Sequence, residues 1–561
     1  MPTASASTAT TLHRRYLVED LGPDGVPTGY RLDCPPDFSF GYDVVDAIAA
    51  AEPDRPALRW SDTTGAVERY TFGDIARRSD AAASWFRSVG VGKGDRVLLV
   101  LRRHPQFWWA VIGLHKIGAV AVPATHLLKA YDLVLRLRDA QITAVVATMD
   151  GGVGAEIDQA EAELGLSLVK AGVCGTPRPG WLDFDTEVAA APPFVPPTGD
   201  DRPVAADPLL LYFTSGTTAQ PKMVSHSHSY PVAHIPTAKY WHRVDPDGLH
   251  LTVSDTGWAK SVWGKLYGQW FMGTCVDVFD FERFDPVALL RHLEEARVTS
   301  FCAAPTVYRF MVDEDLEAYD LSALQHVTTA GEAMNPVVFE TFRERTGLEL
   351  KEGYGQTELT LAVVTNYWQA TKPGSMGLPS SAYDVVLLDE AGREVGVDEE
   401  GEICVRTGDE HPVGLFDGYM DDPATTAASW HDGYYHTHDL ATRDADGYFW
   451  YVGRTDDMIK TSGYRVGPFE VESVVQAHPA VKECAITGAP HPVRGTVVKA
   501  TVVVAAGFEP GDDLAGDIQA FVKARTAPYK YPRIVEFVDA MPVTVSGKIR
   551  RVEIRDRDHA G

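Results

Sequence analysis

The chain repeats short runs of β-branched or aliphatic residues with segments of helical period between them. Eight such runs are Asp95–Leu101, Ala119–Val122, Ile142–Ala147, Leu209–Phe213, Leu249–Val253, Thr274–Phe279, Val298–Cys302 and His326–Thr329. Short strands separated by helices form βαβ units, in which the strands lie parallel. We therefore predict an α/β fold with largely parallel sheets.

Changes in composition divide the chain. The stretch from Gly175 to Pro208 is dense in Pro, Gly, Ala and Asp, so we predict that it cannot sustain a helix and that it connects two βαβ subdomains. The block from Tyr383 to Tyr451 is richer in strand and turn signals and predicts a β-rich subdomain. These three subdomains together make a large N-terminal domain.

The last part of the chain changes character again after Val452. It predicts a helix over Phe469–His478, strands near Ala485 and over Val497–Val504, and an amphipathic helix over about Leu514–Thr526. We predict a small α+β C-terminal domain that begins at a hinge beside Asp456.

Charge and cysteine content narrow the function classes. With 51 basic and 78 acidic side chains the net charge is −27, which repels phosphate backbones and anionic lipid, so we expect no general nucleic-acid or membrane-surface binding. Stable membrane insertion is not expected either, because the aliphatic runs are far shorter than a bilayer-crossing segment. The six cysteines have no zinc-ligand spacing and are expected to be buried thiols in a reducing compartment. No secretion signal or membrane-length apolar run is visible, which predicts a cytoplasmic protein.

The strongest local motif follows an apolar strand. It places the hydroxyl residues Thr214, Ser215, Thr217 and Thr218, with Gly216 and Lys222, in one loop. Hydroxyls and loop N–H groups donate to phosphate oxygens and Lys adds a point charge, so the motif predicts a polyphosphate-binding loop. It is not a Walker motif, because Pro221 stands where Gly is needed. A polar surface turn is the alternative interpretation.

A second motif runs from Lys351 to Leu359 and is interpreted as a glycine-punctuated turn after a strand, ending in Gln356, Thr357 and Glu358. A carboxylate beside a phosphate loop is the hard oxygen ligand that Mg²⁺ prefers, which makes Glu358 the metal candidate. The alternative is a solvated glutamate at a helix N-terminus.

Further candidates lie downstream. Asp439 can accept both ribose hydroxyls, and Arg454 and Arg465 can brace a phosphate or a ribose edge. Surface ion pairing is the alternative for these charges, and for Lys460 it is the one we favour. Lys548 stands on a small flexible tip near the C-terminus. The pair His226 and His228 has no third ligand nearby and is not interpreted as a metal site.

In this order, the four segments resemble the adenylate-forming superfamily of acyl-CoA synthetases, luciferases and adenylation domains. Further segments are most similar to medium-chain acyl-CoA synthetases: Ser254–Trp258, Ala304–Tyr308, Gly331–Glu332, Thr461–Pro468, Pro492–Gly495 and Ala527–Arg533. The resemblance implies an N-terminal extension over residues 1–42, an AMP-binding domain over 43–455 and a mobile C-terminal domain over 456–561, with the hinge at Asp456.

The resemblance also implies roles for individual residues. Lys548, Thr357 and Glu358 are the expected catalytic residues, and Glu358 holds Mg²⁺. ATP and AMP are expected to contact Thr214, Ser215, Gly216, Thr217, Thr218, Lys222, Glu332, Glu352, Gly353, Tyr354, Gly355, Gln356, Thr357, Asp439, Arg454 and Arg465. Coenzyme A is expected along Ser462, Gly463, Tyr464, Arg494, Lys523, Tyr531 and Arg533. Trp258 and Gly331 are expected in the acyl pocket, with a core tryptophan as the alternative for Trp258.

The implied reaction has two halves. A medium-chain, aromatic or branched carboxylic acid attacks MgATP to give an acyl-adenylate and pyrophosphate, and the thiol of CoA then displaces AMP. The alternatives are an enzyme that loads a carrier protein, a CoA ligase for acetate, propionate or butyrate, and a non-catalytic nucleotide-binding scaffold. The sequence leaves open whether the protein is a monomer or a homodimer.

Overall fold

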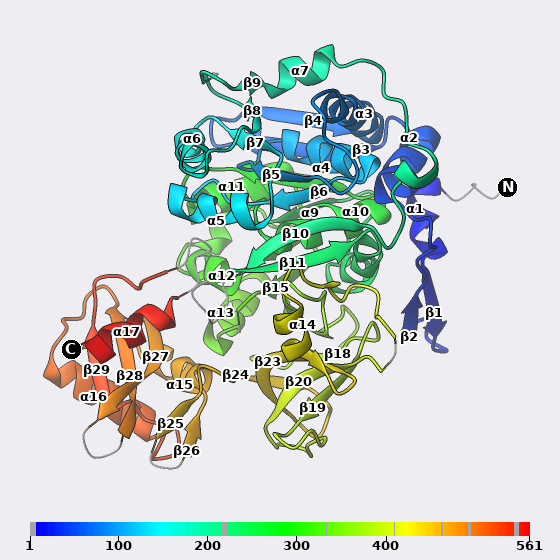
Figure 1. Cartoon of the computed structure of the whole chain (residues 1–561). Coiled ribbons are helices and arrows are strands. Elements are labelled where there is room, and N and C mark those ends of the chain that lie inside the picture. The colour runs from blue at the N-terminus through cyan, green and yellow to red at the C-terminus, as the bar shows by residue number, and fades with distance from the viewer. Residues whose placement is uncertain are drawn as a thin grey trace.

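Figure 1 presents the computed structural model of the chain, a large body with a smaller domain at its C-terminal end. The structure describes residues 7–176, 178–214, 221–332, 334–408, 410–461, 464–491, 495–543 and 549–560, with the backbone alone at 464, 465, 559 and 560. Within these ranges no helix is long and apolar enough to cross a membrane.

The first of two large sheets has eight strands in the order β21-β11-β10-β6-β5-β7-β8-β9. Their bounds are β5 Arg96–Val100, β6 Val120–Pro123, β7 Ala144–Thr148, β8 Val169–Val173, β9 Leu182–Asp183, β10 Pro208–Thr214, β11 Lys222–Ser227 and β21 Gly418–Tyr419. Strands β5 to β10 pair in parallel, whereas β11 returns antiparallel to β10. The phosphate-loop motif therefore joins two paired strands.

The second sheet has nine strands in the order β18-β17-β16-β15-β14-β12-β13-β3-β4. Their bounds are β3 Pro56–Asp62, β4 Val67–Thr71, β12 Leu249–Thr252, β13 Cys275–Asp280, β14 Ser300–Ala303, β15 His326–Ala330, β16 Leu350–Tyr354, β17 Val363–Val364 and β18 Leu378–Pro379. Every residue of β7 and of β15 is buried, as expected for parallel strands covered on both faces.

Helices connect and cover these strands (Figure 1). Their bounds are α1 Thr8–Thr11, α2 Ala47–Ala51, α3 Phe72–Ser88, α4 Gln106–Ile117, α5 Ala130–Asp139, α6 Val153–Leu164, α7 Phe184–Ala190, α8 His234–Pro236, α9 Ala259–Lys265, α10 Tyr267–Phe271, α11 Pro286–Ala296, α12 Pro305–Val312, α13 Pro336–Thr346 and α14 Pro423–Ser429. Four of them begin with proline at the first turn, where the missing N–H costs no hydrogen bond.

Two smaller units complete the chain. The β-rich subdomain contains β19 Asp384–Leu388, β20 Gly401–Arg406, β22 Trp430–His431, β23 Tyr434–Arg443 and β24 Phe449–Arg454. The C-terminal domain contains β25 Ile459–Thr461, β26 Tyr464–Val466, α15 Pro468–Gln476, β27 Val481–His491, β28 Gly495–Val504, α16 Asp512–Lys523, β29 Ile534–Phe537 and α17 Arg551–Ala560. A hairpin of β1 Leu17–Leu21 and β2 Pro27–Leu32 lies at the N-terminal side.

The predicted α/β class, the parallel sheets and all eight predicted strands are confirmed.

The connection predicted over Gly175–Pro208 is wrong in two respects. It contains α7, which Asp183 caps by accepting from the Thr186 N–H at 2.8 Å and which buries Phe184 and Val188. It also does not separate the two sheets, because β10 and β11 return to the first sheet while the early strands β3 and β4 join the second.

Two further expectations need correction. Helix α17 was absent from the prediction, although it closes the C-terminal domain. The six cysteines are all free, but Cys174 is exposed and Cys34 and Cys275 are only half-buried, so the expectation of buried thiols holds for Cys302, Cys404 and Cys484.

Candidate active site

Parallel strands of the second sheet end at one edge, and the predicted site segments follow them there. Gly331 and Glu332 come after β15, and Gly355 to Glu358 come after β16. Such an edge is where open α/β sheets bind ligands. Glu352, Gly353 and Tyr354 were predicted in a turn, but they lie within β16 itself.

Asp439 is the centre of a buried polar cluster. It lies on β23 opposite Arg454 of β24 and is only 5% exposed. The hydroxyl of Tyr354 and the side-chain amide of Gln356 each donate to Oδ2 at 2.6 Å, and the Tyr451 hydroxyl donates to Oδ1 at 3.0 Å. Arg454 Nη1 lies 3.9 Å from Oδ1. The carboxylate is therefore held in place before any ligand arrives.

Gln356 acts as a brace between this cluster and β23. Its Nε2 also donates to the Thr437 carbonyl at 2.8 Å, and its Oε1 accepts from the Tyr435 hydroxyl at 2.8 Å. Both polar atoms of the side chain are thus engaged within the protein.

Glu358 faces the far end of the phosphate-loop motif. Its Oε1 accepts a hydrogen bond from the Tyr419 hydroxyl at 2.9 Å, and Lys222 Nζ lies 4.8 Å from the centre of the same tyrosine ring. Burial raises the pKa of Glu358, against the effect of that hydrogen bond and of Lys222. A half-buried carboxylate at this place is a hard oxygen ligand and fits Mg²⁺.

The phosphate-loop motif is described at its two ends. Thr214 and Lys222 pair across β10 and β11, while Ser215, Gly216, Thr217 and Thr218 lie outside the described residues. His226 donates from Nε2 to the Thr357 carbonyl at 2.7 Å, so it fixes the second motif against β11.

Glu352 and the glycines of the second motif are set by burial and close packing. Burial raises the pKa of Glu352 to about 8, and the Met334 N–H donates to its Oε1 at 3.2 Å. A Cβ on Gly355 would lie 2.6 Å from the Thr360 carbonyl oxygen, and one on Gly353 would lie 2.9 Å from Leu361. Glu332 accepts from the Thr306 hydroxyl at 2.9 Å.

The predicted acyl-pocket residues meet a lysine that the sequence interpretation missed. Trp258 is half-buried and precedes α9, and Gly331 has a φ of +103°. A Cβ on Gly331 would lie 2.9 Å from Lys260 Nζ, which donates to the Ala330 carbonyl. Lys260 therefore crosses the end of β15 beside Gly331.

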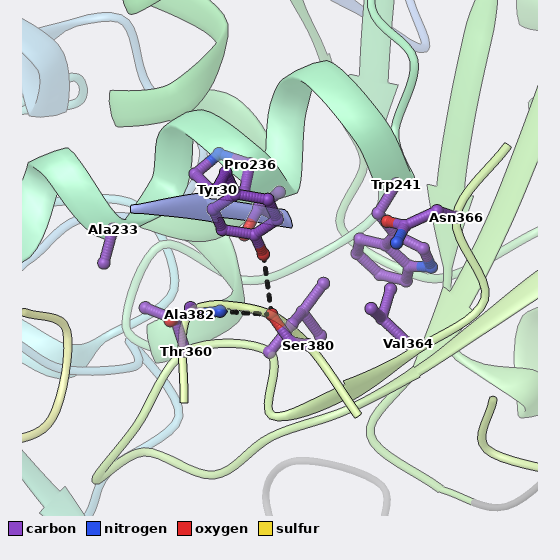
Figure 2. A pocket seen from close by; sticks show the side chains of 11 residues that line it. Tyr30, Ala233, Pro236, Trp241, Thr360, Val364, Asn366, Ser380 and Ala382 are labelled. Atoms are coloured by element: carbon purple, nitrogen blue, oxygen red, sulfur yellow. Dashed lines mark hydrogen bonds between the residues drawn. The ribbon is translucent and has the colours of Figure 1, made fainter. Parts of the chain in front are cut away.

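A small pocket is lined in part by the residues that directly follow the second motif (Figure 2). Thr360 and Leu361 line it together with Tyr30 of β2 and Trp241, and Tyr30 hydrogen-bonds to Ser380 at 2.7 Å. Its lining includes neither Trp258 nor Gly331, so it is not the predicted acyl pocket.

The C-terminal domain brings three of the predicted coenzyme A residues together. The Arg533 guanidinium donates to the Tyr531 hydroxyl at 3.0 Å and lies 4.9 Å from the centre of its ring, and Lys523 Nζ lies 5.6 Å from that centre. Asp456, the predicted hinge, accepts from Arg454 Nε at 3.1 Å.

The other predicted residues lie wholly or partly outside the described part of the chain. Ser462, Gly463, Arg494 and Lys548 lie outside the described residues. Tyr464 and Arg465 are described by backbone alone, in β26 paired with β25.

Tyr419, Tyr435 and Tyr451 contribute contacts that sequence reasoning missed. Each is a tyrosine in or beside a strand, and a buried tyrosine hydroxyl needs a partner. That rule marks them as polar contacts, but their partners are set by the tertiary fold.

Comparisons with known proteins agree with this geometry. The sequence matches the AMP-binding enzyme family over residues 45–420 and the C-terminal domain of AMP-binding enzymes over 470–548. It is 39% identical over 538 residues to the mouse mitochondrial acyl-coenzyme A synthetase ACSM5, covering 94% of this chain and 92% of the relative. It is 37% identical to mouse mitochondrial ACSM3 over 543 residues, with 94% and 92% covered.

Solved structures show the same fold. The anthranilate CoA ligase AuaEII in complex with anthranoyl-AMP superposes with a TM-score of 0.85 at 25% identity, covering 94% of this chain and 98% of the other. A benzoate CoA ligase from Burkholderia xenovorans LB400 gives a TM-score of 0.80 at 28% identity, with 92% and 100% covered. The predicted resemblance is confirmed, and the chain belongs to the AMP-binding enzyme family, alongside acyl-coenzyme A synthetases.

Proposed function

We propose that the protein is an ATP-dependent acyl-CoA synthetase that activates a medium-chain, aromatic or branched carboxylic acid. The observation that carries the proposal is the convergence of the Asp439 cluster and the Glu358–Tyr419–Lys222 group at the edge where β16 ends. Its relatives are named acyl-coenzyme A synthetases, and its structural neighbours include ligases for two aromatic acids.

The first half-reaction has to bring two anions together, so the site must neutralise charge and hold the acid in line with the α-phosphate. We assign the ribose to Asp439, whose two oxygens are oriented by Tyr354, Gln356 and Tyr451. The β- and γ-phosphates go to the loop between Thr214 and Lys222. When bound, Mg²⁺ neutralises phosphate charge, and Glu358 is the residue that would hold it. Lys548 is assigned to the carboxylate of the acid.

In the second half-reaction the thiol of CoA attacks the acyl carbonyl and AMP leaves. We assign the anionic nucleotide end of CoA to Lys523 and Arg533, which share the Tyr531 ring. A cationic pair is needed there because the chain as a whole carries a charge of −27. An enzyme that loads a carrier protein has no need of such a pair, which favours free CoA as the acceptor.

The experiment is a panel of acids assayed with MgATP, with and without CoA. Acetate, butyrate, hexanoate, octanoate, decanoate, isobutyrate and benzoate are compared by pyrophosphate and AMP release. We expect graded activity across neighbouring chain lengths, because each buried methylene contributes about 0.8 kcal/mol. Absence of pyrophosphate with every acid contradicts the proposal.

Two controls separate the alternatives. Highest activity with acetate or butyrate identifies a short-chain ligase, and a preference for a phosphopantetheine-bearing carrier protein over CoA identifies a carrier-loading enzyme.

We also propose that the protein is cytoplasmic. This proposal rests on six unpaired thiols, which are typical of reducing compartments, whereas the relatives named above are mitochondrial proteins. Cell fractionation decides between the two.

A further inference from the structure

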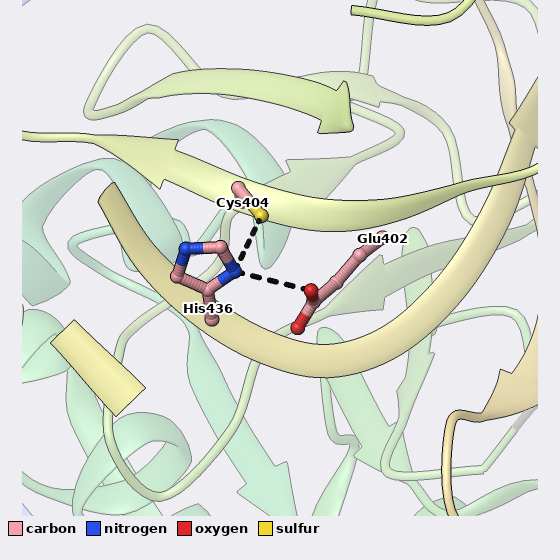
Figure 3. Close-up of side chains that lie close together, drawn as sticks. All are labelled: Glu402, Cys404 and His436. Atoms are coloured by element: carbon pink, nitrogen blue, oxygen red, sulfur yellow. Dashed lines mark hydrogen bonds and ion pairs between the residues drawn. The ribbon is translucent and has the colours of Figure 1, made fainter. Parts of the chain in front are cut away.

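Three side chains of metal-binding type, none of them assigned to the reaction, lie together in the β-rich subdomain (Figure 3). Glu402 and Cys404 are alternate residues of β20, and His436 stands on β23 directly opposite Cys404. Among the residues that the structure describes, this is the only group of three or more such ligands whose atoms all lie within 4.8 Å of one another.

The spacing of the three ligand atoms suits one small cation. His436 Nδ1 lies 3.5 Å from Cys404 Sγ and 3.1 Å from Glu402 Oε2. Around a tetrahedral Zn²⁺ with ordinary bond lengths, a nitrogen and a sulfur lie about 3.6 Å apart and a nitrogen and an oxygen about 3.3 Å apart. The three atoms therefore close on a single ion with small side-chain movements.

Hydrogen bonds between these three side chains cannot join all of them at once, although Glu402 Oε1 also accepts from the His438 N–H at 2.8 Å. A single nitrogen, His436 Nδ1, faces the sulfur and the carboxylate together. This nitrogen carries at most one hydrogen, so it can form a hydrogen bond with only one of these two partners at a time. A cation at the centre interacts favourably with all three groups.

The donor set selects the kind of cation. Sulfur and imidazole ligands favour Zn²⁺ and similar transition metals over Mg²⁺ or Ca²⁺. The Cys404 side chain is fully buried. A bound cation stabilises the thiolate, and the proton then passes to solvent.

Neighbouring histidines complete the surroundings. His438 Nδ1 lies 3.4 Å from Glu402 Oε1 and is 38% exposed, so it stands at the rim where a fourth ligand or a water belongs. The His431 ring stacks on His436 with the ring centres 4.1 Å apart. His431 thus covers one face of the His436 ring, and the half-buried His438 lies beside Glu402.

We propose that Glu402, Cys404 and His436 form a binding site for Zn²⁺, separate from the nucleotide-associated metal. The site lies beside an irregular part of β23, where the pairing register shifts and His438 has a φ of +61°. This irregularity lies between His436 and Asp439, so the ion ties β20 to β23 next to the residue assigned to the ribose. Zinc binding itself does not depend on the proposed function.

The test is a titration of chelator-treated full-length protein with Co²⁺ and Zn²⁺ in excess Mg²⁺. We expect one equivalent of Co²⁺ to give a thiolate-to-metal charge-transfer band that Zn²⁺ abolishes, and Zn²⁺ to raise the unfolding temperature. Cys404→Ala should remove the band and weaken Zn²⁺ binding at least tenfold, as measured against a chromogenic chelator. Glu402→Gln should weaken binding while leaving the band.

Cys174→Ser is the matched control. Cys174 is also near a histidine, with Sγ 3.7 Å from His104 Nδ1, but the neighbouring carboxylate of Asp150 lies at the other ring nitrogen, Nε2. These three groups cannot close on one ion, and this variant should keep the band. Absence of the band in the unmodified protein overturns the proposal whether or not the variants fold. So does a band that survives Cys404→Ala and disappears with Cys174→Ser.

Discussion

At the scale of single residues, the Asp439 carboxylate depends on three donors from two separate places in the chain. Tyr354 and Gln356 come from the end of β16 and Tyr451 from β24. The sequence predicts a polar residue that can accept ribose hydroxyls, but it does not predict these donors, because they meet only when the sheets have packed. The same holds for Glu358, whose partner Tyr419 lies 61 positions away.

Replacing Asp439 by Asn tests the assignment to ribose. The amide keeps the shape but loses the charge and turns one acceptor into a donor that faces hydroxyl or amide donors. We expect KM for ATP to rise at least tenfold, about 1.4 kcal/mol, with the acid's KM much less affected. Steady-state kinetics measure both. Asp384→Asn, at an exposed residue of the same subdomain paired with Arg406, is the control and should change neither. An unchanged KM for ATP in Asp439→Asn refutes the role.

At the scale of elements, apolar periodicity predicts the strands because their burial is encoded locally. The strand predicted over His326–Thr329, for example, appears as β15 over His326–Ala330, with all five residues buried. Helix α17 escaped prediction because, of its side chains that the structure describes, only Ile554 is buried. Helix α7 was not predicted because the segment around it is rich in proline, which argues against a helix. The Asp183 cap and the burial of Phe184 and Val188 nevertheless stabilise it.

An ion pair with a buried carboxylate holds α17 in place. Arg551 donates to both carboxylate oxygens of Glu472 in α15, at 2.8 and 2.7 Å, and Glu472 also accepts from the Ile486 N–H of β27 at 2.8 Å. Removing the cation leaves a buried carboxylate unpaired, so Arg551→Ala should cost about 3 kcal/mol. Hydrogen exchange of the β27 and β28 amides should speed up accordingly.

The chain offers controls for that experiment. Arg550→Ala removes an exposed neighbour that pairs with Glu553 at 3.4 Å, and should cost less than about 0.5 kcal/mol. All 12 tryptophans precede residue 456, so tryptophan fluorescence reports the large domain and its unfolding midpoint should not move. Equal exchange rates in Arg551→Ala and Arg550→Ala contradict the structural role of the pair.

At the scale of the whole molecule, the order of subdomains along the chain could be predicted, but not how they interleave. The strands β3 and β4 precede all other strands of the second sheet in the sequence and complete that sheet next to β13. Pairing of strands some 200 positions apart leaves no local signal. The C-terminal domain, in contrast, is continuous in sequence, and it was predicted. The β-rich subdomain was predicted as well, although β21, which lies within its span, pairs with β11 of the first sheet.

Buried histidines make the stability of the large domain depend strongly on pH. Burial lowers the pKa of His226 and His250 to about 3 and of His228, His326 and His13 to about 4. Burial also places the pKa of three others well below 6.5: His115, His234 and His242. Neither ring nitrogen of His228 has a hydrogen-bond partner among the described residues. These rings stay neutral in the folded state.

The sign of the effect follows from the unfolded chain, in which a histidine binds its proton near pH 6.5. Each histidine whose pKa is lowered in the folded state therefore reduces the free energy of unfolding by about 1 kcal/mol as the pH falls from 7 to 5.5. Glu352 and His104 act in the opposite direction, because the pKa of Glu352 is raised to about 8 and that of His104 to about 9. The eight histidines outnumber them, so the free energy of unfolding should fall as the pH is lowered through 6.5.

Urea unfolding followed by tryptophan fluorescence at pH 7.5, 6.5 and 5.5 measures this fall. Replacing His228 by Gln removes one group that takes up a proton only on unfolding, so the slope of unfolding free energy against pH should become shallower by up to one proton. His431→Gln, at a ring that is 45% exposed, should leave the slope as it is. A free energy of unfolding that stays constant or rises toward pH 5.5 means that these histidines are protonated in the folded protein. That result contradicts the prediction that the buried rings are neutral.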